Sequence, residues 1–289
     1  MPVAKKTFVD MHVHTTCSDG TYTPEEVVRL AVNEGIKVLA ITDHDNVSGI
    51  VRAQVEAEKF GVQIIPGIEC STTFNAVKNG TRHILGYNID PTAYEINRYV
   101  EKQQRNRIEK VEKILKKLRA LGINISYEDV KKHSAGDSIG RPHIARAMVE
   151  QGYVLDKKEA FDKYIGKGGP AYATSEYTSV EEVVYAIIAS GGIPILAHPF
   201  QMRHNTCDEM LEEINNLVDK GVQGIEAIYP EHLEVENFSL VTLALENDLF
   251  ITAGSDFHGE NKEIKLGKCF FNKSRASVEG LKKLGKTIF

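Results

Sequence analysis

The chain has 289 residues and a formal net charge of −5, with 42% hydrophobic and 26% charged residues. This length suits one barrel-sized domain, or one domain with an insertion, and the composition excludes a disordered chain. The acidic balance argues against general nucleic-acid binding over the whole surface, while a local basic cleft stays compatible with it.

The sequence shows no pattern of a membrane-spanning or leader segment and no paired cysteines. No apolar run approaches the roughly 20 residues of a membrane span, and the first residues show no charged-then-apolar leader. We therefore expect a cytoplasmic protein. The four cysteines are widely spaced and form no Cys-x-x-Cys pair, so we expect reduced thiols rather than a zinc ribbon or a disulfide framework.

Short apolar runs alternate with helical patterns over the first hundred residues. Strands are expected at 7–13, 38–42, 63–68 and 83–87, and helices at 23–34 and 48–60. Thr23 can cap the first helix, Pro24 suits its first position, and Gly35 ends it. Strands that alternate with helices indicate a parallel α/β sheet or barrel.

Near Pro91 the pattern changes to helices alone. They are expected at 93–121, 127–133, 142–151 and 157–165. We interpret residues 98–171 as a helical insertion domain, and residues 1–97 with 172–289 as one discontinuous barrel domain. In the second barrel segment, helices are expected at 179–190, 208–220, 234–247 and from 277. Strands are expected there at 193–197, 224–229, 250–253 and 267–271.

Histidines and carboxylates lie at or near the ends of these strands. Alternate residues of a strand share one side, so His12 and His14 can converge on one ion. In a parallel barrel, the carboxyl ends of the strands form a single face. The whole set is His12, His14, Asp19, His44, Glu69, His83, His198, Asp256 and His258.

This set predicts a site for several metal ions. So many carboxylates and imidazoles on one face are costly without cations, and a single catalytic zinc takes only three protein ligands. We therefore expect two or three divalent ions. Mixed histidine and carboxylate ligands suit Mn²⁺, Fe or Zn²⁺ and fit Ca²⁺ or Cu poorly. Of the suitable metals, we expect manganese first.

The motifs that carry the set resemble those of the PHP (polymerase and histidinol phosphatase) family. They are residues 11–20, 40–45, 65–69, 197–199 and 254–258. The resemblance covers both α/β segments and implies a distorted seven-stranded (β/α) barrel with a trinuclear site. It implies one ion held by His12, His14, Glu69 and Asp256, a second by Glu69, His83 and His198 with Glu69 bridging, and a third by Asp19, His44 and His258. Glu69, His198 and Asp256 are the expected catalytic residues.

The expected insertion offers candidate substrate-binding residues. Residues 139–147 and 82–87 resemble the bacterial group that includes nucleoside 3′,5′-bisphosphate phosphatases and a 5′-to-3′ exoribonuclease. Arg141 comes just before Pro142, the expected first residue of a helix. Free N–H groups and a partial positive charge at a helix start favour a phosphate, and a guanidinium completes such a site. We expect Arg141 to bind substrate, with His143, Arg105 and Arg107 as further candidates.

These features predict a metal-dependent phosphoesterase. The expected substrate is a phosphate monoester of a small nucleotide, such as a nucleoside 3′,5′-bisphosphate, attacked by a metal-bound hydroxide. The main alternative is a 5′-to-3′ exoribonuclease acting on short RNA, followed by a histidinol-phosphate phosphatase. An amidohydrolase and a non-catalytic binding module also stay open. We expect no membrane association and no obligate protein partner.

Overall fold

The computed structural model describes residues 6–72, 81–133, 139–174 and 178–289. The contacts among residues divide the chain into two compact units. Residues 1–100 and 178–289 form what we call the barrel unit, and residues 101–177 form the helical unit. The domain boundaries expected from the sequence, at 98 and 171, stay a prediction.

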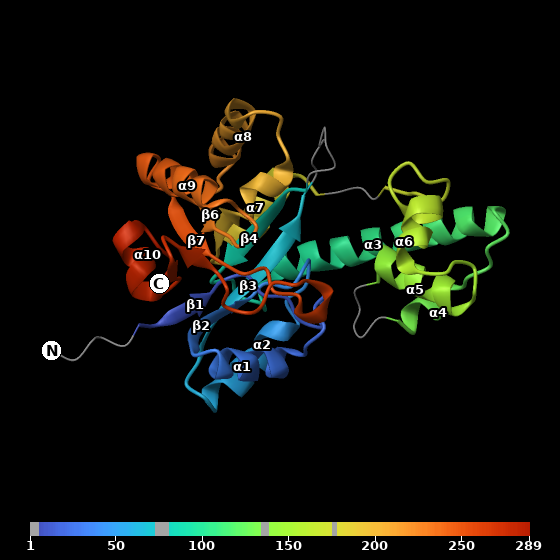
Figure 1. Ribbon diagram of the computed structural model, residues 1–289, viewed down its shortest axis with the longest axis horizontal. Coiled ribbons are helices and arrows are strands. Elements are labelled where there is room, and N and C mark those ends of the chain that lie inside the picture. The colour runs from blue at the N-terminus through green and yellow to red at the C-terminus, as the bar shows by residue number, and fades with distance from the viewer. Residues whose placement is uncertain (1–5, 73–80, 134–138, 175–177) are drawn as a thin grey trace. The chain divides into compact units, whose positions relative to one another are not determined.

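Seven strands form one sheet at the centre of the barrel unit, in the order β1 to β7 (Figure 1). They are β1 (Phe8–Asp10), β2 (Ile36–Ile41), β3 (Gln63–Ser71), β4 (His83–Tyr87), β5 (Ile193–Leu196), β6 (Gly224–Ile228) and β7 (Phe250–Ala253). The Met11 N–H donates to Ala253 O over 3.0 Å, and a bridge joins Val13 to Phe257. The two ends of the sheet therefore meet, which confirms the expected distorted (β/α) barrel.

The strand β4 runs antiparallel to both of its neighbours, so the expectation of an all-parallel sheet is wrong here. Parallel neighbours need a crossover of a dozen or more residues, and only residues 72–82 separate β3 from β4. The reversal pairs His83, the first residue of β4, with Ser71, the last residue of β3. His83 thereby lies at the edge where the parallel strands end.

Helices surround these strands (Figure 1). They are α1 (Pro24–Asn33), α2 (Gly49–Glu58), α7 (Val180–Ala189), α8 (Cys207–Asp219), α9 (Glu234–Glu246) and α10 (Val278–Leu284). Thr23 caps α1 as expected: its hydroxyl accepts from the Glu26 N–H, and the Glu26 carboxylate accepts from the Thr23 N–H. Two 3₁₀ turns, η2 (Pro199–Met202) and η3 (Gly259–Asn261), follow β5 and β7.

The strand expected at 267–271 does not join the barrel. Instead, β8 (Phe270–Phe271) pairs with β9 (Ser274–Arg275) in a separate two-stranded hairpin. The two residues between them, Asn272 and Lys273, have φ of 45° and 59°. Two central residues with positive φ are the geometry of a tight hairpin turn, which sends the chain back on itself.

The helical unit has its own hydrophobic core. The helix α3 (Tyr94–Ala120) begins in the barrel unit and contributes its residues from 101 onward to the helical unit. The helical unit also holds α4 (Tyr127–Lys131), α5 (Arg141–Glu150), α6 (Lys157–Ala160) and a π-helical turn η1 (Phe161–Ile165). Ile114, Leu118, Ile144 and Met148 are fully buried within it. The structure starts α5 at Arg141, one residue earlier than expected, with Gly140 as its N-cap.

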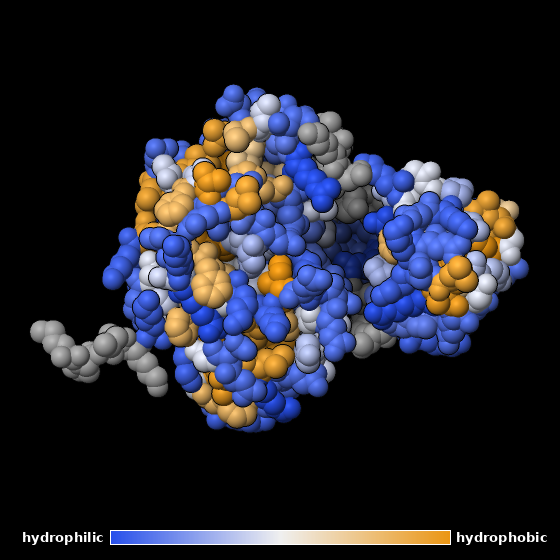
Figure 2. Space-filling view, viewed as in Figure 1, coloured by the Kyte–Doolittle hydropathy of each residue, from blue (hydrophilic) through white to orange (hydrophobic). Residues whose placement is uncertain are grey.

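The surface of both units is mostly hydrophilic in the view of Figure 2. Hydrophobic residues gather on the barrel unit near α9, where Leu233 and Val235 are 65% and 66% exposed. Exposed apolar side chains of this kind are ordinary on a folded protein. No helix among the described residues is long and apolar enough to cross a membrane.

Candidate metal centre

The structure brings all nine predicted metal ligands together at one end of the barrel. Their donor atoms form three overlapping groups, each with ligand atoms within 4.8 Å of one another. The groups are His12, His14, Glu69 and Asp256; His14, Asp19, His44 and His258; and His44, Glu69 and His83. His198 joins them through Glu69, because its Nε2 lies 2.9 Å from Oε1 of that carboxylate.

Glu69 lies at the centre of this cluster. Its Oε2 lies 3.0, 3.1 and 3.2 Å from ring nitrogens of His44, His14 and His12. Its Oε1 lies 2.8 and 2.9 Å from ring nitrogens of His83 and His198. Each carboxylate oxygen therefore faces a different set of imidazoles, which is the arrangement of a bridging ligand.

The polar atoms of the cluster fit divalent cations. Despite the short distances, Oε2 of Glu69 and Nδ1 of His44 are buried and make no well-directed hydrogen bond. The Nε2 atoms of His12 and His14 point at one another, 3.1 Å apart. Buried lone pairs that converge in this way require protons or cations. Imidazoles and carboxylates without a thiolate suit Mn²⁺, Fe or Zn²⁺.

Burial and the opposed charges shift the pKa values of the cluster. Burial alone would raise the pKa of Glu69, but the surrounding His44, His12 and His83 hold it well below its ordinary value. Burial would lower the pKa of His14, but its close contacts with the carboxylates of Asp256 and Glu69 raise it to about 9. Burial lowers the pKa of His44 to about 3. Without cations, protons on histidines such as His14 balance the carboxylates at neutral pH.

The backbone of the site is held in uncommon conformations. His198 and Asp256 have φ of 25° and 55°, a region that few residues other than glycine adopt. Such conformations persist where the surroundings fix them, and they cluster at functional sites. Gly254, just after β7, allows a close approach: a Cβ there would lie 2.3 Å from Cβ of His12 and 2.6 Å from Oε1 of Glu226.

Glu226 supports the cluster but was not among the residues predicted from the sequence. This residue of β6 is fully buried; its Oε1 lies 3.0 Å from Nδ1 of His12, and its Oε2 accepts a hydrogen bond from the His198 N–H over 2.9 Å. The signal that could have found it is a single carboxylate inside the otherwise apolar strand Gly224–Ile228, because glutamate is almost never fully buried unless it is paired. Glu226 thus orients two of the predicted ligands.

Two further carboxylates near the cluster hold its loops. Asp43 accepts hydrogen bonds from the Thr15 N–H over 2.8 Å and the Ser18 hydroxyl over 2.6 Å, and so fixes the turn between His14 and Asp19. Asp45 does the same for the end of β3, where it accepts from the Ser71 N–H over 2.9 Å. Buried acids that receive several such bonds stay ordered without a metal.

The helical unit contains the predicted substrate-binding residue Arg141. Its guanidinium carbon lies 5.6 Å from the ring centroids of both Phe161 and Tyr172. Burial and the positive charges of Arg141 and Arg107 lower the pKa of Lys110 to about 8. We call Arg107, Lys110 and Arg141 the basic cluster. A local excess of positive charge of this kind attracts an anion.

The other two substrate candidates make local contacts. Arg105 is 64% exposed in its side chain and pairs with Glu101, one turn earlier in α3, over 3.8 Å. Nδ1 of His143 accepts a hydrogen bond from the Gly140 N–H over 3.0 Å and so caps α5. A role for either residue in substrate binding stays a prediction.

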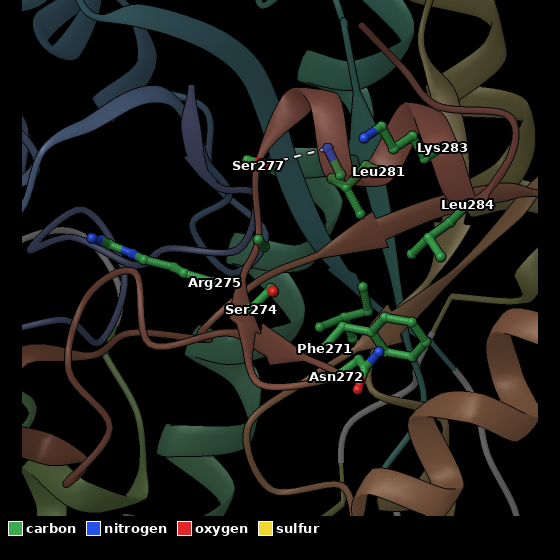
Figure 3. A pocket seen from close by; sticks show the side chains of 11 residues that line it. Phe271, Asn272, Ser274, Arg275, Ser277, Leu281, Lys283 and Leu284 are labelled. Carbon is green, nitrogen blue, oxygen red and sulfur yellow. Dashed lines mark hydrogen bonds between the residues drawn. The ribbon is translucent and has the colours of Figure 1, made fainter. Parts of the chain in front are cut away.

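A separate pocket of about 290 Å³ lies in the barrel unit between the β8–β9 hairpin and α10 (Figure 3). Phe271, Leu281 and Leu284 line it with apolar surface, and its charged lining residues are Arg275 and Lys283. None of the nine predicted ligands lines this pocket. This pocket is therefore separate from the histidine and carboxylate cluster.

A barrel with this cluster at its strand ends has the fold and site of a metal-dependent hydrolase. Residues 10–227 match the PHP domain, and the chain belongs to the PHP family. It is 34% identical over 262 residues to a 5′-3′ exoribonuclease of Haemophilus influenzae, covering 90% of this chain and 93% of that protein. It is 30% identical over 253 residues to a 3′,5′-nucleoside bisphosphate phosphatase of Chromobacterium violaceum, covering 86% and 87%.

Solved structures agree with this family assignment. A Chromobacterium violaceum protein described as an amidohydrolase, with bound sulfate and no metal, superposes with a TM-score of 0.79 at 28% identity, covering 96% of this chain and 97% of that one. A Bifidobacterium adolescentis protein described as a metal-dependent phosphoesterase gives a TM-score of 0.78 at 27% identity, covering 100% and 99%. The chain is a metal-dependent hydrolase of phosphoric esters.

Proposed function

We propose that this enzyme hydrolyses a phosphate monoester of a small nucleotide, such as a nucleoside 3′,5′-bisphosphate. The observation that carries the proposal is the pair of Glu69 oxygens, each facing its own set of imidazoles, because this arrangement suits adjacent metal ions. The Chromobacterium violaceum relative, a 3′,5′-nucleoside bisphosphate phosphatase, supports the substrate class. We further propose that the enzyme acts in the cytoplasm.

We propose two or three divalent ions, with manganese first and iron or zinc as alternatives. Their ligands would be the nine residues of the cluster, with Glu69 shared between two ions. When bound, such ions supply an activated water near neutral pH and neutralise charge on the phosphoryl oxygens.

The catalytic work of the protein itself falls to Glu69, His198 and Asp256. The two oxygens of Glu69 belong to one carboxylate, so Glu69 fixes the separation between the two sets of imidazoles that face them. Oδ1 of Asp256 lies 3.2 Å from Nε2 of His14, inside the cluster, where it would serve as a metal ligand. His198, whose backbone N–H is held by Glu226, positions its ring against Glu69.

The basic cluster of the helical unit supports recognition of a second phosphate. Arg141 is the first residue of α5, so its guanidinium and the partial positive charge of that helix start both favour an anion. Lys110 adds a positive charge near Arg141, and Arg107 adds another near Lys110. A phosphate group of the substrate is the kind of anion that such a cluster favours.

A second candidate function is 5′-to-3′ exoribonuclease activity on short RNA. It is favoured by the 34% identity to the Haemophilus influenzae exoribonuclease and by 32% identity over 275 residues to the exoribonuclease Rnm of Escherichia coli. The rings of Phe161 and Tyr172 beside Arg141 also suit base stacking. Amide hydrolysis has less support, because Glu69 takes the bridging place that a carboxylated lysine holds in many amidohydrolases.

One substrate panel separates these functions. Mn²⁺-loaded protein is supplied with 3′,5′-bisphosphorylated adenosine, with 5′-monophosphorylated short RNA and with histidinol phosphate, and released phosphate and nucleotides are quantified. We expect release of the 3′-phosphate alone from the bisphosphate. Stepwise release of mononucleotides from RNA, with little action on the bisphosphate, would instead establish the exoribonuclease.

The route of the reaction is tested in ¹⁸O-labelled water. We expect a single turnover to place one solvent oxygen directly in the released phosphate. Label found in the protein rather than in the phosphate would overturn direct attack by water.

A further inference from the structure

Four polar residues outside the nine predicted ligands form a connected group beside Asp256: Tyr229 and Lys262 contact its carboxylate, and Gln201 and Glu231 contact the Tyr229 hydroxyl. They come from loops at the same end of the barrel: Gln201 from η2, Tyr229 and Glu231 from the segment after β6, and Lys262 directly after η3. We call these four the outer quartet. Tyr229 is only 1% exposed, whereas the Lys262 side chain is 32% exposed.

The two oxygens of Asp256 have separate surroundings. Oδ1 faces the imidazoles, 3.2 Å from Nε2 of His14 and 3.3 Å from Nδ1 of His258. Oδ2 faces the outer quartet, 2.9 Å from the Tyr229 hydroxyl and 2.5 Å from Nζ of Lys262. A carboxylate can offer one or two oxygens to a metal. The hydrogen-bond donors on Oδ2 therefore determine whether Asp256 offers one or both of its oxygens to a metal.

Tyr229 alone cannot hold Oδ2 continuously. Its hydroxyl has one proton, and a second carboxylate oxygen, Oε2 of Glu231, also lies 2.9 Å away. Gln201 donates to the same hydroxyl over 2.8 Å and so occupies its acceptor side. The ammonium of Lys262 has three protons, and its hydrogen-bond and ion-pair partner among the described residues is Oδ2 of Asp256. Lys262 is therefore the donor that Asp256 keeps in either orientation of the tyrosine hydroxyl.

We propose that Lys262 is a positioning residue of the metal centre: its ammonium holds Oδ2 of Asp256 so that only Oδ1 is presented to the metal. The proposal rests on the metal-dependent function given above. It accounts for the positive φ of Asp256, since a backbone in this region needs contacts that fix the side chain. Partners of this kind around metal ligands commonly change metal affinity by 10- to 100-fold.

A purely electrostatic role of Lys262 makes the opposite prediction. A positive charge beside a cation site repels the cation, so its removal alone would tighten metal binding. If Lys262 instead positions Asp256, its removal weakens binding despite the lost repulsion. The sign of the change in affinity therefore separates the two roles.

The test compares K262M, K262R and Y229F with the wild-type protein. The control is K265M, which removes one positive charge at an exposed lysine three residues further on. Mn²⁺ affinity is measured by competition with a chelating dye, and melting temperature shows that each variant is folded. We expect about tenfold weaker Mn²⁺ binding in K262M, recovery in K262R, a smaller loss in Y229F and no change in K265M. With the bisphosphate substrate at saturating Mn²⁺, we expect K262M to lower kcat more than it raises KM.

Several outcomes would overturn the proposal. They are equal or tighter Mn²⁺ binding in folded K262M, no recovery in K262R, or a larger loss in Y229F than in K262M. A wild-type protein that binds neither Mn²⁺ nor Zn²⁺ would instead overturn the metal-dependent function, and this result appears before any variant is compared.

Discussion

Oε1 of Glu226 lies 3.0 Å from Nδ1 of His12, on the side of the ring away from the other ligands. Nε2 of the same ring faces Glu69 at 3.2 Å and His14 at 3.1 Å. A carboxylate on one ring nitrogen fixes the proton there and leaves the lone pair of the other nitrogen for a metal. Glu226 thus sets the tautomer of His12 without belonging to the predicted ligands.

The substitution E226Q is expected to weaken metal binding by about 10- to 100-fold while the protein stays folded, because it removes the charge that orients His12. Competition with a chelating dye measures the change. E234Q, on the exposed surface of α9, is the matched control. Unchanged affinity in E226Q would show that His12 is oriented by other contacts.

Glu69 and Asp19 are expected to differ in how many metals depend on them. Glu69 faces two sets of imidazoles, whereas Asp19 approaches only the set around His258 and is 49% exposed. We expect E69Q to lose more than one equivalent of metal per chain and D19N to lose one or fewer. Elemental analysis of purified, metal-loaded variants gives these ratios. Equal losses in both variants would contradict a bridging role for Glu69.

The stability of the metal-free protein should depend on pH in a defined direction. The pKa of His14 is raised to about 9 from an unfolded value near 6.5, through its bonds to Asp256 and Glu69. The proton it carries therefore stabilises the fold fully below pH 6.5, and this stabilisation is lost as the pH rises through about 9. We expect the melting temperature of chelator-treated protein to fall between pH 6.5 and 9.

Metal loading is the control for this pH effect. Metal displaces the ring proton, so the metal-loaded protein should show a smaller decline over the same interval. A melting temperature of the metal-free protein that is flat or rises would contradict the assignment of that proton to the folded cluster.

Arg141 is expected to act on substrate affinity and not on metal binding. A charge-assisted hydrogen bond to a phosphate contributes about 1.5–3 kcal/mol, so R141A should raise KM for the bisphosphate by about 10- to 100-fold. Adenosine 3′-monophosphate, which lacks the second phosphate, should be affected much less. Steady-state kinetics on both substrates measure the difference. An equal rise in KM for both substrates would indicate that Arg141 stabilises the helical unit and does not bind the second phosphate.

Much of the barrel could be predicted because its signals are local. Apolar runs, helix caps such as Thr23 and glycine stops depend on neighbouring residues, and the resulting elements match the observed ones closely. The direction of β4 could not be inferred from its own residues, because an apolar strand reads alike in both directions. The length of the 72–82 connection was the available signal for the reversal.

The nine ligands could be predicted from the sequence because each is a metal-binding residue type at or near a strand end. The residues that orient them are less visible, since they act through the folded arrangement. Glu226 left one trace, a carboxylate within an apolar strand. Lys262 has no such signal in the sequence, because a lysine in a polar loop is ordinary and only the fold brings its Nζ to Asp256.

The reversal of β4 also bears on how the metal centre assembles during folding. Glu69 and His83 belong to neighbouring strands joined by a short connection, so they become neighbours through a contact that is local in sequence. His12 and Asp256 come from opposite ends of the chain and meet only when Val13 pairs with Phe257. Contacts between distant segments carry the larger loop-closure entropy and form slowly. The complete set of ligands around Glu69 therefore exists only in the closed barrel. The rate of metal binding during refolding should accordingly report the rate of barrel closure.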